Sequence, residues 1–386
     1  MPALCKTRNG MKIMRENWNE YELGQLLSYE QPTPYIVEST DYNDANKTPV
    51  LTAGKSFILG YTNEDFGIYR KLPVIIFDDF TTASQYVNFP FKVKSSAMKI
   101  LTPNTELVLP QYIYYRMQII QFDASTHKRY WIQQYSKIKV SIPSLAEQER
   151  IISRIEELFS QLDAGVETLK KTKAQLAVYR QAVLKEAFKN CDEYVTIETV
   201  CHHVTDGDHM PPPKAESGIP FIMISNVESN TINWSGTAYV GTDYYEKIDD
   251  KRKPQAGDVL YTVTGSYGIP ILVDFEKEFC FQRHIALLRP NEKILQKYLY
   301  FVLMEPGVYA QATEGATGTA QKTVGLGVLR KIRIPFVADK CKQAVTVDTI
   351  ERNLSVCDSI EQTVDAALQQ ADALRQSILK QAFEGG

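Results

Sequence analysis

Several patterns that mark membrane, secreted or disulfide-rich proteins are missing from this chain of 386 residues. It has no run of about 18 apolar residues that could span a bilayer. Residues 1–18 contain four basic residues and no apolar segment of the kind found in secretory signals. The six cysteines form no C-x-x-C pair, which excludes the common zinc-ribbon and redox spacings. We therefore expect a cytoplasmic protein with reduced thiols and no membrane partner.

Catalytic signatures are missing as well. The sequence contains no Gly-x-Ser-x-Gly elbow, no His-Glu-x-x-His and no glycine-rich dinucleotide loop. An amino-methyltransferase needs Asn/Asp-Pro-Pro-aromatic, and Met210-Pro-Pro-Pro-Lys214 lacks both ends of that tetrapeptide. Gly54-Lys55-Ser56 resembles the end of a phosphate-binding loop, but Pro49 stands where that motif requires a glycine. These absences favour a binding protein over an enzyme.

One segment leaves a catalytic alternative open. Potential metal ligands crowd the segment from Cys201 to His209, but no second ligand pair stands at a zinc-like distance in sequence. We favour a turn at Asp206-Gly207-Asp208, followed by three prolines, over a metal-dependent enzyme. We therefore predict no metal site.

The sequence does contain a repeat with an offset of 195 residues. Arg180-Gln-Ala-Val-Leu-Lys-Glu-Ala-Phe188 returns as Arg375-Gln-Ser-Ile-Leu-Lys-Gln-Ala-Phe383. Apolar residues at the heptad interval lead into both copies in the same register. They are Ile155, Leu162, Leu169, Leu176 and Val183, then Ile350, Cys357, Val364, Ala371 and Ile378. We expect two long helices that pack against each other along this seam.

A short alternating strand pattern and a proline precede each helix. The two copies are Lys139-Val-Ser-Ile-Pro143 and Lys331-Ile-Arg-Ile-Pro335, which differ by 192 residues, so the second helix region has three extra residues near its start. Between the repeats, short β-branched and aromatic runs alternate with turn residues, as in mixed α/β domains. The predicted parts are an N-terminal extension (1–16), a first globular domain (17–141), a central helix (142–189), a second globular domain (190–333) and a C-terminal helix (334–386).

Basic residues gather before each helix, although the net charge is −3. They outnumber acidic residues between Lys92 and Val140, and Gly315 to Ala338 contains no acidic residue. A solvated charged face is the alternative for either segment. Because the two segments occupy equivalent places in a duplicated chain, they favour contact with a polyanion.

Candidate DNA contacts are side chains in expected loops that can bond to base edges or phosphates. The densest group is His127-Lys-Arg-Tyr-Trp131, for which an aromatic pair buried beside a solvated basic turn is the alternative. Thr319-Ala-Gln-Lys322 takes the corresponding place in the second half. Thr264–Gly268 and Gln282–His284 are further candidates, for which a turn at the end of a strand is the alternative. The full set is His127, Lys128, Arg129, Tyr130, Lys55, Ser84, Gln85, Asp208, His209, Ser266, Tyr267, Arg283, Thr319, Gln321 and Lys322.

A set of short phrases throughout the chain carries a family resemblance. They are Leu145-Ala-Glu-Gln148, the two Leu-Lys-x-Ala-Phe repeats, Leu51–Phe57, Leu72–Phe80, His127–Trp131, Asp206–His209, Gly218–Phe221 and Gly257–Leu260. With them, the chain resembles the DNA-specificity subunits (HsdS) of Type I restriction-modification systems over nearly its whole length. One departure is Ala338-Asp339-Lys340, which we align with Ala146-Glu147-Gln148 and which predicts weaker partner docking at the second helix.

The resemblance implies a non-catalytic subunit with two target-recognition domains, each reading one half of a bipartite sequence in double-stranded DNA. Two antiparallel helices would hold these domains apart, and a helix from Glu147 to Lys189 would be about 60 Å long at about 1.5 Å per residue. It also implies that two methyltransferase subunits dock on the helices and that restriction subunits join through them. S-adenosylmethionine and ATP with Mg²⁺ would be cofactors of those partners, and this chain would hold none.

An alternative from another class is a coiled-coil adaptor that joins proteins without touching DNA. An adaptor has no need of basic segments beside divergent globular inserts. We therefore favour DNA binding.

Overall fold

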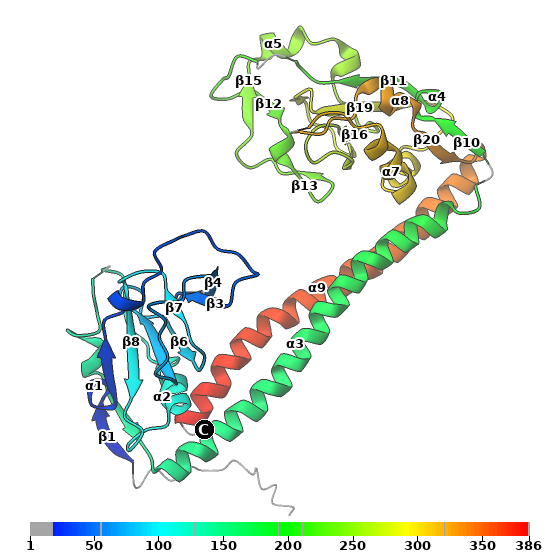
Figure 1. The fold of residues 1–386 in the computed structure, drawn as a ribbon. Helices are drawn as coiled ribbons and strands as arrows, with labels where there is room; N and C mark the ends of the chain where they lie inside the picture. The colour runs from blue at the N-terminus through cyan, green and yellow to red at the C-terminus, as the bar shows by residue number, and fades with distance from the viewer. Residues whose placement is uncertain are drawn as a thin grey trace, which may run out of the picture. The chain divides into compact units, whose positions relative to one another are not determined.

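The computed structural model describes residues 18–384 of the chain except 55, 127, 192, 210, 211 and 320. Its internal contacts divide into two compact units. The first unit contains residues up to Leu169 together with those from Ala366 onward, and the second contains Lys170–Asp365 (Figure 1). Each of two long helices, α3 (Leu145–Phe188) and α9 (Lys340–Glu384), therefore has one half in each unit.

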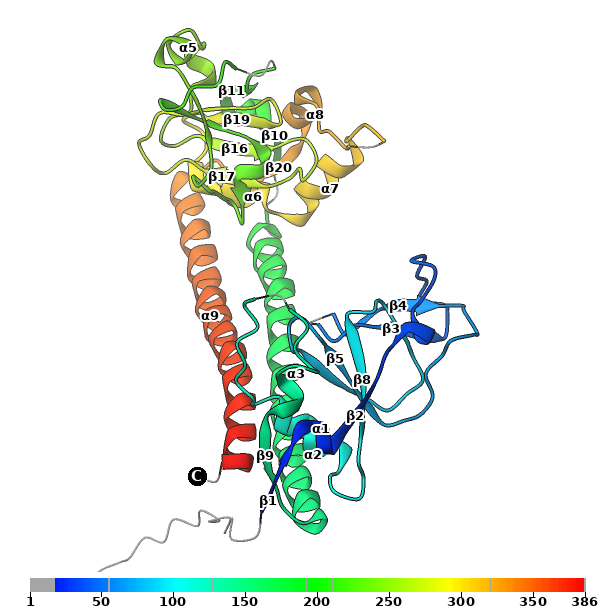
Figure 2. The same ribbon diagram turned by 90° about the vertical axis from the view of Figure 1, so that its left-hand side faces the viewer.

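The first unit is built on a four-stranded antiparallel sheet with the order β2-β8-β5-β6, of which Figure 2 labels β2, β8 and β5. A three-stranded sheet in the order β4-β3-β7 accompanies it, with β3 and β7 parallel. The elements are β1 (Asn19–Glu22), α1 (Leu23–Leu26), β2 (Leu27–Glu30), η1 (Thr33–Tyr35), β3 (Thr48–Leu51), β4 (Ile58–Thr62), β5 (Val74–Asp78), β6 (Ser84–Val87), β7 (Lys92–Val93), β8 (Met98–Pro103), α2 (Pro110–Met117), η2 (Tyr135–Lys137) and β9 (Lys139–Ile142). Strands β1 and β9 pair and close the domain next to α3.

Strand β5 explains why the first unit has two cores. Its sequence Val-Ile-Ile-Phe is continuously apolar because both faces of the strand are buried. Ile75 and Phe77 point into a core shared with α2 and the ends of the long helices. Val74 and Ile76 point the other way, toward the three-stranded sheet.

The second unit repeats this topology with a different sequence. Its four-stranded sheet has the order β11-β19-β16-β17, and its three-stranded sheet has the order β15-β12-β18 with β12 and β18 parallel. The elements are β10 (Glu193–Thr196), α4 (Ile197–Val200), β11 (Cys201–Asp206), β12 (Ile219–Ile222), η3 (Ile224–Asn226), β13 (Val227–Glu228), β14 (Thr231–Ile232), β15 (Ala238–Val240), α5 (Thr242–Glu246), η4 (Asp250–Arg252), β16 (Val259–Thr262), β17 (Pro270–Leu272), β18 (Cys280–Phe281), β19 (Ile285–Pro290), α6 (Gln296–Leu303), α7 (Pro306–Glu314), α8 (Leu326–Lys331) and β20 (Arg333–Phe336). The β13–β14 hairpin, α5 and α7 have no counterpart among the described elements of the first unit, whereas α8 precedes β20 as η2 precedes β9.

The prediction of two long helices, each preceded by a strand, is confirmed. Pro143 ends β9 as expected, whereas Pro335 lies inside β20 and pairs with Tyr194, so the second strand does not end at its proline. The helices run antiparallel in each unit and bury apolar residues of the seam between them. In the first unit Ile155, Ala371 and Ile378 are buried and Leu162 and Leu169 are half-buried. In the second unit Leu176, Ile350, Cys357 and Val364 are buried and Val183 is half-buried.

An ion pair flanks the seam in each unit. Arg375 binds Asp163 in the first unit, and Arg180 binds Asp358 at 2.6 Å in the second. Each residue of one pair has its sequence counterpart, 195 residues away, in the other pair. This one pair is therefore repeated as contacts are in an isologous dimer. The pairs of Arg180 with Glu361 and of Lys173 with Asp365 are not repeated, because Val166 and Lys170 stand at the counterparts of the two acidic residues.

A buried glutamine ties the start of α3 to the first domain. Gln148 is fully buried. Its Oε1 accepts a hydrogen bond from the Leu109 N–H at 2.7 Å. Its Nε2 donates to the carbonyl oxygens of Leu107 and Pro143, both at 2.9 Å. The side chain thus joins the end of β9, the entry to α2 and the first turn of α3.

Gln343 makes the same three bonds at the start of α9. Its Oε1 accepts from the Leu295 N–H at 2.7 Å, and its Nε2 donates to the carbonyls of Lys293 and Val337 at 2.9 and 2.7 Å. Gln343 is the counterpart of Gln148 at the 195-residue offset. The alignment of Ala338-Asp339-Lys340 with Ala146-Glu147-Gln148 is therefore wrong, because the three extra residues lie before Gln343. The departure that predicted weaker docking at the second helix no longer stands.

Candidate nucleic-acid interface

One end of the main sheet in the second unit gathers most of the candidates of that half. Strands β11 and β16 end there and β19 begins there, since Asp206 pairs with Ala286 and Thr262 with Ile285. The Val263 N–H donates to the His284 carbonyl at 2.9 Å. The loops that carry Asp208, His209, Ser266, Tyr267 and Arg283 therefore leave the sheet side by side. This placement could not be read from sequence distance.

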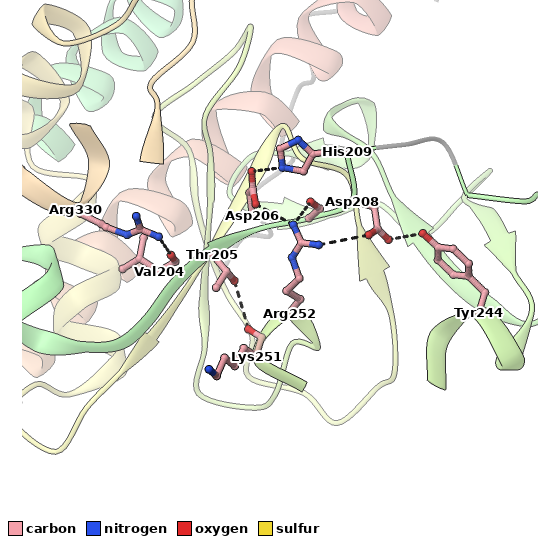
Figure 3. Close-up of polar contacts among 10 residues, drawn as sticks. Val204, Thr205, Asp206, Asp208, His209, Tyr244, Lys251, Arg252 and Arg330 are labelled. Atoms are coloured by element: carbon pink, nitrogen blue, oxygen red, sulfur yellow. Dashed lines mark hydrogen bonds and ion pairs between the residues drawn. The ribbon is translucent and has the colours of Figure 1, made fainter. Parts of the chain in front are cut away.

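The segment after β11 is fixed by a polar network around Arg252 of η4 (Figure 3). The Arg252 Nη2 donates to Asp206 Oδ1 at 3.1 Å and to the Gly207 carbonyl at 3.0 Å. The Tyr244 hydroxyl donates to Asp208 Oδ2 at 2.6 Å, and His209 Nε2 lies 2.9 Å from Asp206 Oδ2. Both carboxylates are thus engaged within the protein, while the imidazole of His209 stays exposed.

Backbone bonds join this segment to the turn before β19. The Asp208 N–H donates to the Phe281 carbonyl at 3.0 Å, and the Arg283 N–H donates to the Asp208 carbonyl at 3.1 Å. A cavity of about 310 Å³ opens between the two segments, with Asp208, His209, Arg283 and His284 among its lining residues. Burial and the neighbouring Arg283 guanidinium lower the pKa of His284. Arg283 and Lys214, which also lines the cavity, both place exposed positive charge at this rim.

A second loop cluster is formed by the turn after β16 and a hairpin before α8. Thr323 forms isolated antiparallel β-bridges with Thr264 and with Thr317. The Gly265 N–H also donates to the Lys322 carbonyl at 3.0 Å. Thr319, Gln321, Lys322 and Ser266 are all exposed. The candidates 264–268 and 319–322, separated in sequence, therefore form one surface, which the sequence alone did not predict.

Tyr309 of α7 supports this surface and was missed by sequence reasoning. Its ring stacks on Tyr267 with centroids 5.7 Å apart, and it is 46% exposed. The Tyr267 hydroxyl donates to Thr313 Oγ1 at 3.3 Å. Gly268 allows this arrangement because it has φ 90° and because a Cβ there would collide with the Tyr309 ring. No sequence signal marks Tyr309, since its partner lies on another element.

In the first unit the candidates are dispersed. Lys128 and Arg129 are exposed, and the Arg129 guanidinium lies 5.8 Å from the Phe80 ring centroid, above the turn after β5. Gln85 is half-buried in β6. Lys55 and His127 lie outside the described residues. Only Lys128 and Arg129 are thus both described and presented to solvent at a loop.

Two candidates of the first half are buried, so we do not retain them as base or phosphate contacts. Tyr130 is 2% exposed, and its hydroxyl accepts a hydrogen bond from the Thr126 N–H at 3.1 Å. Trp131 beside it is also buried, which is the buried-aromatic alternative for this segment. Ser84 is 7% exposed, and its Oγ accepts from Gln118 Nε2 at 2.9 Å. The partner of Ser84 comes from the end of α2, which the sequence pattern does not reveal.

The segment from Cys201 to His209 has no metal-like arrangement. Burial raises the pKa of the Cys201 thiol to about 12. His202 lies near Glu292 on the surface, and Asp206 and Asp208 contact Arg252. Among the described residues no cluster of His, Cys, Asp and Glu could hold a metal ion. The described helices include none long and apolar enough to cross a membrane.

Comparison with known proteins identifies a consistent set of relatives. The profile of the Type I restriction modification DNA specificity domain matches residues 15–177 and again 195–370. The EcoR124I/EcoR124II specificity subunit of Escherichia coli is 34% identical over 357 residues, which cover 87% of this chain and 85% of the relative. The EcoBI specificity subunit of Escherichia coli is 24% identical over 424 residues, which cover 98% and 88%.

Solved structures share the fold of the chain. One comes from work on complex assembly and conformational transition of the type I R-M system and has a TM-score of 0.70 at 15% identity. The alignment covers 96% of this chain and 98% of the solved chain. The HsdS subunit from Thermoanaerobacter tengcongensis has a TM-score of 0.54 at 15% identity, with 96% and 97% covered. The sequence matches disfavour the adaptor alternative.

Proposed function

Because the chain belongs to the DNA-specificity subunits of Type I restriction-modification systems, we propose that each of its two target-recognition domains binds one half of a bipartite target in double-stranded DNA. The chain is the non-catalytic subunit, which selects the sequence on which its partners act. The observation that carries the proposal is the repeated topology, in which two sheets with the same strand order present different exposed loops. Two domains that differ in their loops can select two different half-sequences.

In the first domain we assign the DNA contacts to Lys128 and Arg129, with Lys55, His127 and Gln85 as further candidates. In the second we assign them to His209 and Arg283 at the cavity rim and to the surface formed by Ser266, Tyr267, Thr319, Gln321 and Lys322. Arginine suits two-bond recognition of guanine, and lysine suits phosphate. Contacts with phosphates would make the affinity fall steeply as the salt concentration rises.

We also propose the composition of the complex. Residues 17–141 and 190–333 are the target-recognition domains, and 142–189 and 334–386 form the helical scaffold. Two methyltransferase subunits dock on this scaffold, with restriction subunits joining through them, and the complex works in the cytoplasm. The matching bonds of Gln148 and Gln343 support two equivalent docking places. S-adenosylmethionine, ATP and Mg²⁺ are then bound by the partners.

A map of methylated adenines tests the proposal. The chain is produced together with its methyltransferase partner, in cells without other adenine methylation, and every methylated adenine is located. We expect one bipartite sequence with a constant gap, and no methylation by the purified chain alone. Methylation without sequence preference, or methyl transfer by the chain without its partner, would contradict the proposal.

A further inference from the structure

The second target-recognition domain connects its two sheets by a longer segment than the first. Residues 241–258, between β15 and β16, contain α5 and η4, whereas residues 63–73 make the same connection in the first domain without a described helix. Two side chains of this longer segment, Tyr244 and Arg252, reach the segment Asp206–His209 (Figure 3). The connection therefore supplies two side chains that bond to part of the candidate DNA surface.

Arg252 holds three consecutive residues of that segment. Its guanidinium bonds to the carboxylate of Asp206 and to the carbonyl of Gly207, and its Nη1 lies 3.8 Å from Asp208 Oδ1. A planar guanidinium can satisfy several acceptors at fixed angles, which a lysine cannot do. The conformation of Asp206–Asp208 is thus set by one side chain from a different part of the chain.

Asp208 transmits this constraint to the turn that carries Arg283. One carboxylate oxygen of Asp208 accepts from Tyr244, and its backbone bonds to Phe281 and to Arg283. Gly207 has no room for a side chain, because a Cβ there would collide with the Phe281 carbonyl. Hydrogen bonds therefore tie the segment, the turn and the Arg252 guanidinium together.

We propose that Arg252, assisted by Tyr244, is a positioning residue that sets the geometry with which Arg283 and His209 meet the second half of the DNA target. Asp208, which sequence reasoning placed among the DNA contacts, belongs to this support, because its carboxylate already accepts the Tyr244 hydroxyl and faces Arg252. The inference rests on the proposed DNA-reading function. It adds that base discrimination in the second domain depends on a residue that does not itself touch DNA.

The test compares Arg252→Met with Lys251→Met, a neighbour in η4 whose loss removes the same charge. The complex of each variant with its methyltransferase is titrated with the mapped target, with single base-pair changes in either half, and at two salt concentrations. For Arg252→Met we expect discrimination at the second half-site to fall by about 10- to 100-fold, the worth of one good base contact. We expect discrimination at the first half-site and the salt dependence of binding to stay unchanged.

Lys251→Met is expected to leave discrimination at both half-sites intact. Tyr244→Phe keeps the ring and removes only the hydroxyl, so it tests the same support if Arg252→Met fails to fold. We expect a smaller loss of discrimination than for Arg252→Met, confined to the second half-site. Thermal unfolding of each variant is measured in parallel.

Three outcomes overturn the inference. Arg252→Met with unchanged discrimination at the second half-site shows that Arg252 positions nothing. A weaker salt dependence with intact discrimination shows that Arg252 is a phosphate contact. Equal losses at both half-sites show a general structural role. If the unsubstituted complex itself shows no discrimination between targets, the proposed function fails, which is a separate result.

Discussion

The two target-recognition domains hold their candidate reading loops by different means on the same strand order. In the first domain the loop ending at Trp131 is anchored to Asp79, whose carboxylate accepts from the Trp131 N–H at 2.8 Å and pairs with Lys99 at 3.3 Å. Asp79 and Lys99 are both fully buried. In the second domain the corresponding loop, which contains Thr319, Gln321 and Lys322, is joined to the end of β16 by backbone bonds: the Val324 N–H donates to the Val263 carbonyl at 2.8 Å and the Gly265 N–H donates to the Lys322 carbonyl at 3.0 Å. A different loop, Asp206–His209, is held by Arg252, whose side chain is 30% exposed. A buried ion pair therefore supports one candidate loop of the first domain, whereas a half-exposed side-chain network supports a different candidate loop of the second.

The structure of the helical scaffold is thus repeated between the two halves of the chain, whereas the contacts that hold the candidate loops are not. The helices repeat their buried glutamines and one Arg–Asp pair at the same offset in sequence, whereas the side chains that hold the candidate loops differ between the domains. Such a chain can change one loop system without disturbing the other domain or the helices. The predictions below test how far this separation goes.

The largest effect is expected from Lys99→Met. The substitution leaves the Asp79 carboxylate buried without its cation, which costs about 3–5 kcal/mol. We expect the first unit to unfold at lower denaturant concentration, as measured by hydrogen exchange of β5 and β8, while exchange in β16 and β19 stays the same. In the double variant Lys99→Met, Asp79→Asn, much of the loss should be recovered. Equal destabilisation of both units would show that they are not separate.

Gln148→Leu and Gln343→Leu test whether the starts of α3 and α9 are equivalent. Each leaves one N–H and two carbonyls without their side-chain partner, so each should cost about 2–4 kcal/mol. The losses should match in size and should each fall in the unit that contains the substitution, as seen by hydrogen exchange. Glu149→Leu, on the exposed neighbour of Gln148, serves as the control with little effect. Clearly unequal losses would contradict equivalence of the two helix starts.

Acid should weaken the first unit through Glu64, a smaller effect. Burial alone would raise the pKa of Glu64, but hydrogen bonds from Lys92 and from the Ser39 and Glu38 N–H groups outweigh burial and lower it. The free energy of unfolding therefore includes a contribution that is present above pH 4.5 and is lost as the pH falls through the lowered pKa. In Glu64→Gln this acid-dependent loss should disappear from a urea titration between pH 5 and about 3. An unchanged slope would exclude the Glu64–Lys92 pair as its source.

The smallest effect is expected at the helix ion pairs. Asp163→Asn and Asp358→Asn each remove one partner of the equivalent pairs with Arg375 and Arg180, and exposed pairs contribute less than about 1 kcal/mol. The two losses should be similar in double-substitution cycles with the matching arginine. A coupling energy several times larger at one pair would break the two-fold description of the helix interface.

Most of the scaffold was predictable from the sequence because its signals are local and periodic. The heptad spacing and the strand before each proline appear directly in the chain, and the resemblance gave the family. The counterpart of Gln148 was misplaced because three extra residues shift the start of α9, and only the shared bonding pattern identifies Gln343.

The candidate interface was less predictable, because burial is decided by distant partners. Tyr130 is a residue type that can bond to and stack on DNA, yet it is buried, and its N–H donates to the carbonyl of the distant Asp79. No sequence pattern marks Arg252 as part of the interface, because its contacts with Asp206 and Asp208 join segments that are far apart in the sequence. The grouping of Ser266 with Lys322 likewise depends on strand pairing that sequence distance does not contain.

The central claim is that each domain reads its own half of the target, and paired arginine substitutions test it most directly. Arg129→Ala and Arg283→Ala complexes are produced separately, and the methylated adenines of each are mapped. We predict that Arg129→Ala relaxes or abolishes recognition of one half-sequence only, that Arg283→Ala affects only the other, and that the gap is unchanged. Loss at both half-sequences from either substitution, or loss at the same half-sequence from both, would contradict the account.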